Sequence, residues 1–222
     1  MENGFLKVAL ISPKVEVANP LFNVKEMLKA IDKCSCHMAV FPELSISSYS
    51  AGDLFFHKNL LDDCYSGLDY FLKHNNFKGI TVLGCPIILD QLVLNCAIVV
   101  QGNKILGVVP KFYLPNTKEY YEKRWFNSGF DCIDNYQAID LLGQFVPFGN
   151  LIFSDGDFSF GVEICEDMWA TITPGNLLSV NGANVIVNIS ASNEVVGKEH
   201  VRRNAVLEHS RKNSGAYIYV SA

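Results

Sequence analysis

The sequence predicts an α/β fold with mixed sheets, organised as one domain. Short apolar runs rich in β-branched residues alternate with segments that have apolar residues at helical spacing, which is typical of layered α/β proteins. Two turn signals between strand-like runs, at 102–103 and 154–157, indicate hairpins, so the sheets are not purely parallel. A chain of 222 residues is long enough for a single hydrophobic core.

Each element follows from a local pattern. Strand-like runs are expected at 7–12, 37–43, 79–89, 95–100, 150–153, 158–164, 183–189 and 216–221. Helices are expected where apolar residues recur at steps of three and four, around Val24, Leu28 and Ile31 and at 54–71, 174–181 and 197–213. Aromatic and charged residues follow Pro110, and Pro115 interrupts them, so residues 111–129 are predicted to form a long ordered loop.

Composition and charge argue against several kinds of protein. Hydrophobic residues make up 49% and charged residues 18%, which is far from the composition of a disordered chain. The net charge is −5 and the few basic clusters lie in helix-like segments, so nucleic-acid binding is not expected. No apolar run approaches about 18 residues and the first residues do not resemble a signal peptide, so we expect a cytoplasmic protein with no membrane partner.

The cysteines do not have the spacing of a metal site or a disulfide scaffold. There are seven of them, an odd number, and no C-x₂-C pair occurs. We therefore expect reduced thiols and no metal. Cys85 and Cys96 lie among apolar residues and are predicted to pack in the core.

Three polar residues each follow an apolar strand-like run: Glu43, Lys111 and Cys165. Open α/β folds place active sites outside the carboxyl ends of strands, so the three side chains are expected to share one rim. A cysteine attacks as the thiolate, and the carboxylates of Glu166 and Asp167 would raise the pKa of the thiol beside them. A base at Glu43 and a cation at Lys111 would counter that effect. The combination predicts a hydrolase that breaks the carbon–nitrogen bond of an amide.

Taken singly, each residue has a simpler interpretation. A buried cysteine at a strand end is structural more often than catalytic, a carboxylate there commonly caps a helix, and a lysine is usually solvated. The combination of base, cation and nucleophile favours catalysis. If the chain turns into a helix after Cys165, the backbone N–H of Glu166 is a candidate donor to an oxyanion.

Longer stretches around these residues resemble a known family. The segments V-F-P-E-L at 40–44, K-F-Y-L-P-N-T-K-E-Y-Y-E-K-R-W-F at 111–126 and G-V-E-I-C-E-D-M-W at 161–169 resemble the nitrilase superfamily of carbon–nitrogen hydrolases. Together with N-I-S-A-S-N at 188–193, they are similar to the N-terminal glutaminase domain of glutamine-dependent NAD synthetases. The resemblance runs from Lys7 to the last residue and implies a four-layer α-β-β-α sandwich.

The resemblance also implies roles for individual residues. Glu43 matches the general base, Cys165 the nucleophile that forms a thioester with glutamine, and Lys111 the cation that faces the tetrahedral intermediate. The other implied site residues are Glu122 as a support, Glu166 through its backbone N–H, and Tyr49, Thr117 and Ser192 as substrate contacts. Thr117 stands where the family commonly has an aromatic residue, so glutamine affinity is expected to differ.

The same resemblance sets expectations for domains and partners. Residues 1–222 would form the glutaminase domain, incomplete at its C-terminus, with the C-terminal synthetase domain of the same polypeptide absent. No S-G-G-x-D-S loop is found, so no cofactor is expected here, and ATP and magnesium would serve only the absent domain. A strand left exposed in such a fragment invites association, so a homo-oligomer or marginal stability is expected.

Two other functions stay open at this point. One is a freestanding amidase or nitrilase that acts on another small amide or nitrile. The other is a non-catalytic fragment that serves only as an assembly module. Release of ammonia from glutamine would separate both from a glutaminase.

Overall fold

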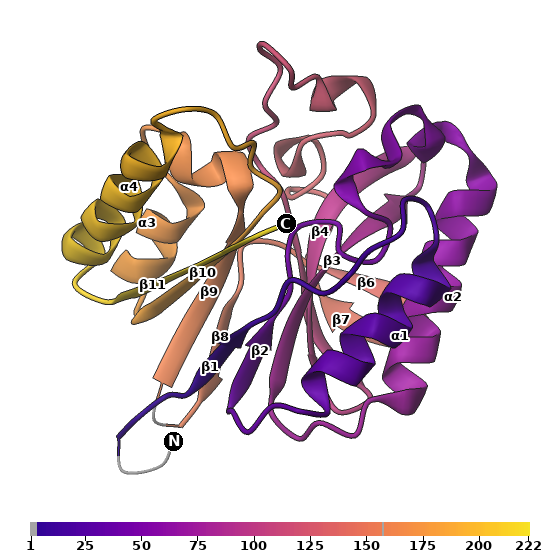
Figure 1. Cartoon of the computed structure of the whole chain (residues 1–222), viewed down its shortest axis with the longest axis horizontal. Helices are drawn as coiled ribbons and strands as arrows, with labels where there is room; N and C mark the ends of the chain where they lie inside the picture. Colours follow the sequence, from indigo (N-terminus) through magenta and orange to yellow (C-terminus); the bar gives the residue numbers. More distant parts are fainter. Residues whose placement is uncertain (1–3, 157) are drawn as a thin grey trace.

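The structure is a computed structural model that describes residues 4–156 and 158–222. Two sheets pack face to face, with helices α1 and α2 on one outer face and α3 and α4 on the other (Figure 1). The predicted α/β class and the implied four-layer α-β-β-α sandwich are confirmed. No helix in the described part of the chain is both long enough and apolar enough to span a bilayer.

The first sheet has the order β1-β2-β3-β4-β5, and its first three strands are parallel. Its strands are β1 (Val8–Leu10), β2 (Met38–Val40), β3 (Ile80–Leu89), β4 (Leu92–Gln101) and β5 (Lys104–Pro110). The last two run antiparallel to their neighbours, as the turn signal predicted. Gly102 begins the two-residue turn between β4 and β5 with a φ of 58°, which glycine adopts without strain. Pro110 ends the edge strand β5, where its missing N–H is tolerated.

The second sheet has the order β11-β10-β9-β8 and is also mixed. Its strands are β8 (Ile152–Asp155), β9 (Phe158–Ile164), β10 (Val185–Ser190) and β11 (Ala216–Ser221). The pair β8–β9 is antiparallel and the other two pairs are parallel. The predicted turn at 154–157 joins β8 to β9, although Asp157 lies outside the described residues.

The helices cover both outer faces and shorter 3₁₀ turns occupy the connections. The helices are α1 (Pro20–Ile31), α2 (Lys58–His74), α3 (Pro174–Val180) and α4 (Lys198–Asn213). The 3₁₀ turns are η1 (Tyr49–Phe56), η2 (Glu122–Arg124), η3 (Gly129–Asp131) and η4 (Cys165–Trp169). The helices begin and end close to the predicted boundaries, with one exception.

That exception is the helix expected from residue 54, which begins at Lys58. Gly52 has φ 58° and ψ −132°, values outside the helical region, and His57 is extended. The preceding residues therefore form η1, separate from α2. The sequence analysis also missed a hairpin of β6 (Ala138–Leu141) and β7 (Gln144–Pro147), which packs against β5.

Two apolar layers hold the sandwich together. The layer between the sheets includes Met38, Val99, Phe160, Val162 and Ile189, each 0% exposed. A second layer, between the first sheet and its helices, includes Val24, Met27, Phe41, Leu68 and Phe71, also 0% exposed. Burial of one such side chain contributes about 1.5–3 kcal/mol.

The cysteines behave as the sequence predicts. Cys85 and Cys96 face each other across β3 and β4, and both are 0% exposed. The seven cysteines are free thiols.

Candidate active site

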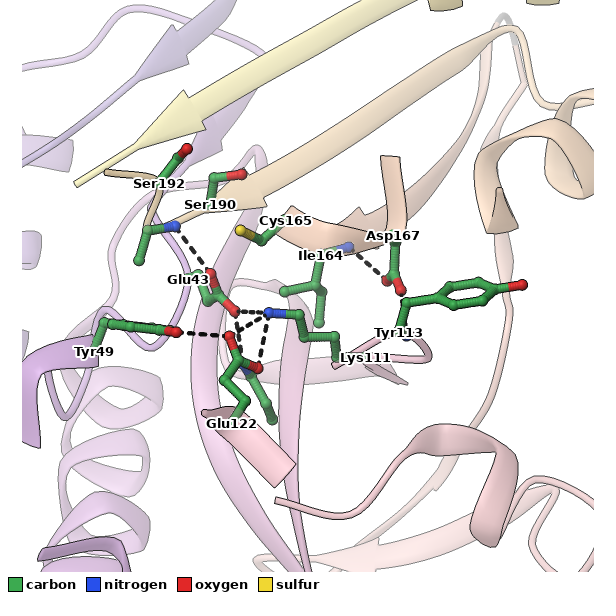
Figure 2. Close-up of polar contacts among 12 residues, drawn as sticks. Glu43, Tyr49, Lys111, Tyr113, Glu122, Ile164, Cys165, Asp167, Ser190 and Ser192 are labelled. Carbon is green, nitrogen blue, oxygen red and sulfur yellow. Dashed lines mark hydrogen bonds and ion pairs between the residues drawn. The ribbon is translucent and has the colours of Figure 1, made fainter. Parts of the chain in front are cut away.

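The structure brings together the three residues that follow strands. Glu43 follows β2, Lys111 follows β5 and Cys165 follows β9, so both sheets contribute to one rim. Lys111 Nζ lies 2.6 Å from Glu43 Oε1, and neither side chain is exposed. Figure 2 shows the Cys165 sulfur directed toward Glu43, beside the lysine.

The Glu43 carboxylate is held by donors from both sheets. Asn95 Nδ2, on β4, donates to Oε1 over 2.7 Å. The backbone N–H of Ala191, just after β10, donates to Oε2 over 2.9 Å. These two bonds and the Lys111 ion pair fix the orientation of the carboxylate, as a proton acceptor at a reacting centre requires.

Lys111 lies between two carboxylates. Its Nζ is 2.7 and 2.9 Å from the two Glu122 oxygens as well as 2.6 Å from Glu43. Burial opposes the lysine charge, but Glu43 and then Glu122 raise its pKa well above the ordinary value. The ammonium is therefore retained in the interior, where a cation stabilises negative charge more strongly than it does in water.

Glu122 is the second carboxylate of this network. Tyr49 Oη donates to its Oε1 over 2.8 Å, and the carboxylate is completely buried. Burial raises the pKa of Glu122 to about 7, with Lys111 opposing and Glu43 reinforcing that rise. One ammonium between two buried carboxylates leaves the cluster one positive charge short, so proton uptake by a carboxylate is favoured.

Cys165 has a backbone conformation that few residues adopt. Its φ is 47°, in the left-handed region, at the point where β9 ends and η4 begins. Burial first, and then Glu43, raise the pKa of the thiol above its ordinary value, while Lys111 and the N–H of Ala191 lower it. The resting thiol is therefore protonated at neutral pH, and its attack on a carbonyl requires a base.

The electrostatic argument from the sequence needs a correction. It assigned the unfavourable charge near Cys165 to Glu166 and Asp167, whereas the carboxylates with the largest effects on the thiol are Glu43 and Glu122. Glu43, which forms an ion pair with Lys111, therefore also disfavours the thiolate form of Cys165 in the resting site.

Asp167 has a positioning role that sequence reasoning missed. Its Oδ1 accepts from the N–H groups of Phe112 and Tyr113 over 3.1 and 2.8 Å. Its Oδ2 accepts from the N–H of Ile164 over 2.9 Å (Figure 2). Burial raises its pKa to about 8, and the N–H groups of Tyr113 and Ile164 oppose that rise. Asp167 thus ties the segment after Lys111 to the strand that ends at Cys165. The signal available in the sequence was a carboxylate next to the buried end of a strand.

A second polar group lies behind Cys165. Asn188 Nδ2 is 3.5 Å from the Cys165 carbonyl oxygen and 3.4 Å from Glu163 Oε1. Ser190 Oγ donates to Asn188 Oδ1 over 2.8 Å. These β10 residues belong to the N-I-S-A-S-N motif, but only their contacts reveal that they brace the strand end.

A cavity of about 520 Å³ opens beside this cluster. Three of the predicted site residues, Glu43, Tyr49 and Ser192, line it. Cys165 is only 6% exposed and is not among the lining residues.

One predicted substrate contact, Thr117, lies outside the lining of this cavity. Thr117 is exposed and does not line the cavity, whereas Tyr120, three residues further along the same loop, does. The loop has no regular periodicity, so its sequence does not indicate which side chain turns inward.

These groups have the chemistry needed for acyl transfer. Glu43 is placed to accept a proton, Lys111 is a retained cation, and Cys165 is a thiol that needs the base. In the described ranges, 4–156 and 158–222, no three His, Cys, Asp or Glu side chains gather as metal ligands.

Sequence comparisons relate the whole chain to larger enzymes. No family model matches it. It is 33% identical over 230 residues to a glutamine-dependent NAD(+) synthetase of Mycobacterium tuberculosis, and the match covers 100% of this chain and 33% of that protein. The chain thus spans about a third of the length of the curated relatives that it matches.

Comparisons of structures agree with this relationship. The glutamine-dependent NAD+ synthetase of Acinetobacter baumannii superposes with a TM-score of 0.82 at 26% identity, covering 97% of this chain and 38% of that one. A nitrilase-superfamily amidase of Nesterenkonia AN1 superposes with a TM-score of 0.76 at 14% identity, covering 97% and 76%, and this likeness shows the fold alone. The chain therefore has the nitrilase fold, and its whole length is related to about one third of the length of a glutamine-dependent NAD synthetase.

Proposed function

We propose that this chain hydrolyses the side-chain amide of glutamine through a Cys165 thioester. As part of a longer polypeptide, it would supply the ammonia that amidates nicotinic acid adenine dinucleotide to NAD. The observation that carries the proposal is the buried Lys111 ammonium, 2.6 Å from Glu43 and beside Cys165. The relationship to glutamine-dependent NAD synthetases supports glutamine as the substrate.

The first half of the proposed cycle forms the thioester. Glu43 accepts the thiol proton, and the sulfur of Cys165 attacks the amide carbon. Lys111 and the N–H of Glu166 face the oxyanion of the tetrahedral intermediate. As this intermediate collapses, the carbon–nitrogen bond breaks and the proton held by Glu43 passes to the nitrogen, which leaves as ammonia.

The second half restores the enzyme. Glu43 accepts a proton from water, whose oxygen attacks the thioester carbon, and glutamate leaves as the carbon–sulfur bond breaks. The proton returns to the Cys165 sulfur. Glu122 does not react in this scheme. Its two contacts to Lys111 hold the ammonium in place, and Tyr49 and Ser192 contact the substrate.

Measurement of ammonia release from glutamine tests this function. Cys165→Ala is expected to lower the rate by at least about a thousandfold, since the nucleophile of a covalent mechanism is lost. Cys34→Ala is the matched control, because Cys34 is partly exposed and precedes β2, whereas Glu43 follows that strand, and the variant should retain the rate. Wild-type protein that releases no ammonia, or equal rates in both variants, would contradict the proposal.

A second candidate is a freestanding amidase that acts on a small aliphatic amide. Faster turnover of propionamide than of glutamine would support it. The predicted oligomer, cytoplasmic location and independence of cofactors stay predictions.

A further inference from the structure

Tyr120 is a cavity residue to which the mechanism above gives no role. It lies in the loop after β5, is half-buried, and lines the same cavity as Glu43 and Ser192. Its ring meets that of Tyr49 edge-on, with centroids 6.4 Å apart and an interplanar angle of 77°. The two rings form one aromatic wall of the cavity.

The Tyr120 hydroxyl is an available hydrogen-bond donor. It accepts the N–H of Asn193 over 2.8 Å, and the neighbouring group for its own proton is the hydroxyl of Ser192, which also lines the cavity. Burial raises the pKa of Tyr120, with the Asn193 N–H opposing, so the phenol keeps that proton at neutral pH. A tyrosine hydroxyl and a serine hydroxyl side by side on a cavity wall can both donate to an oxygen atom of a ligand.

The surroundings of this hydroxyl suit a negatively charged group. Lys198 Nζ lies 5.9 Å from the centre of the Tyr120 ring and also contacts Asn193 Oδ1. Ser192, next to Asn193, adds a hydroxyl to the cavity lining. Donors and a cation therefore gather at this corner, where the carboxylate of Glu119 also lines the cavity, while the carboxylate of Glu43 lies at the reacting end.

We propose that Tyr120 is a specificity-determining residue that donates its O–H to the α-carboxylate of an amino-acid amide substrate. The substrate's side-chain amide then reaches Cys165. This inference rests on the proposed glutaminase function and adds to it the group that recognises the carboxylate end of the substrate.

Two substrates that differ only in the carboxylate test the role of Tyr120. They are glutamine and 4-aminobutanamide, which lacks the α-carboxylate. In Tyr120→Phe, kcat/KM for glutamine should fall about tenfold or more through a higher KM, the effect of losing a hydrogen bond to a charged group. Turnover of 4-aminobutanamide should not change. Tyr121→Phe is the matched control, because Tyr121 is 50% exposed and does not line the cavity.

A binding measurement separates this inference from the proposed function. Glutamate should protect Cys165 from iodoacetamide, and Tyr120→Phe should need about tenfold more glutamate for equal protection. An equal fall of kcat/KM for glutamine and 4-aminobutanamide would mean that Tyr120 only supports the loop, and would overturn the inference. Unchanged kinetics and unchanged protection by glutamate in Tyr120→Phe would also overturn it. If wild-type protein hydrolyses no glutamine while Tyr120→Phe still weakens protection, the proposed function alone fails.

Discussion

Lys111→Met tests how the buried charge cluster is held. The substitution keeps the approximate length of the side chain but leaves Glu43 and Glu122 facing each other without a cation, and neither carboxylate is exposed. Removal of one partner from a buried ion pair costs about 3–5 kcal/mol. Because domains of this kind are stable by about 5–15 kcal/mol, the variant should fold but unfold at clearly lower denaturant concentration.

The loss of stability in Lys111→Met should depend on pH, and the raised pKa of Glu122 determines whether it grows or shrinks as the pH rises. Burial raises the pKa of Glu122 to about 7 even though Lys111 lowers it, so removal of the lysine raises it further. An acid with a raised folded-state pKa binds its proton more tightly when folded, so stability falls as the pH rises from about 4.3 toward the folded value. Each further unit of rise adds about 1.4 kcal/mol to the loss at high pH.

Urea unfolding at pH 5, 6.5 and 8 measures this effect. The free energy of unfolding of Lys111→Met should lie furthest below wild type at pH 8 and approach it at pH 5. Lys123→Met, at an exposed position in the same loop, should stay within about 0.5 kcal/mol of wild type. Addition of Glu122→Gln to Lys111→Met should recover part of the loss at pH 8. A loss that is the same at pH 5 and pH 8 would refute this account of the cluster.

Two further substitutions test how the rim is positioned. Asp167→Asn should lower the free energy of unfolding by about 1–3 kcal/mol and slow glutamine hydrolysis, because the new amide would point a donor at the N–H of Ile164. Calorimetry measures the stability and ammonia release measures the rate. Asp134→Asn, at an exposed site, should change neither. Gly84→Ala should destabilise by at least about 2 kcal/mol in urea unfolding, since its Cβ would lie 2.1 Å from the backbone nitrogen of Leu44, and an unchanged midpoint would contradict this close approach.

Local patterns were sufficient to predict most strands. The run at 216–221 coincides with β11, and that at 158–164 with β9, because β-branched and aromatic residues fill both. The site was predictable for a related reason: Lys111 and Cys165 come directly after a strand, Glu43 comes shortly after one, and strand ends meet in folds of this kind.

Features that depend on distant contacts were not predictable in this way. Asp167 looked like an unfavourable neighbour of Cys165 until its bonds to Phe112 and Tyr113 were seen. The choice between Thr117 and Tyr120 depends on how an aperiodic loop folds over the cavity. The start of α2 depends on the conformation of Gly52, which apolar spacing does not encode.

Because the site is divided between two sheets, its reactivity shows whether the two sheets have packed against each other. Glu43 and Lys111 come from the first sheet, and Cys165 and Ala191 from the second. The base and the cation thus lie on one sheet and the Cys165 thiol on the other, so covalent capture of a glutamine mimic by Cys165 requires the native interface between the sheets. Labelling during refolding would therefore time the closure of the sandwich, separately from the formation of its strands.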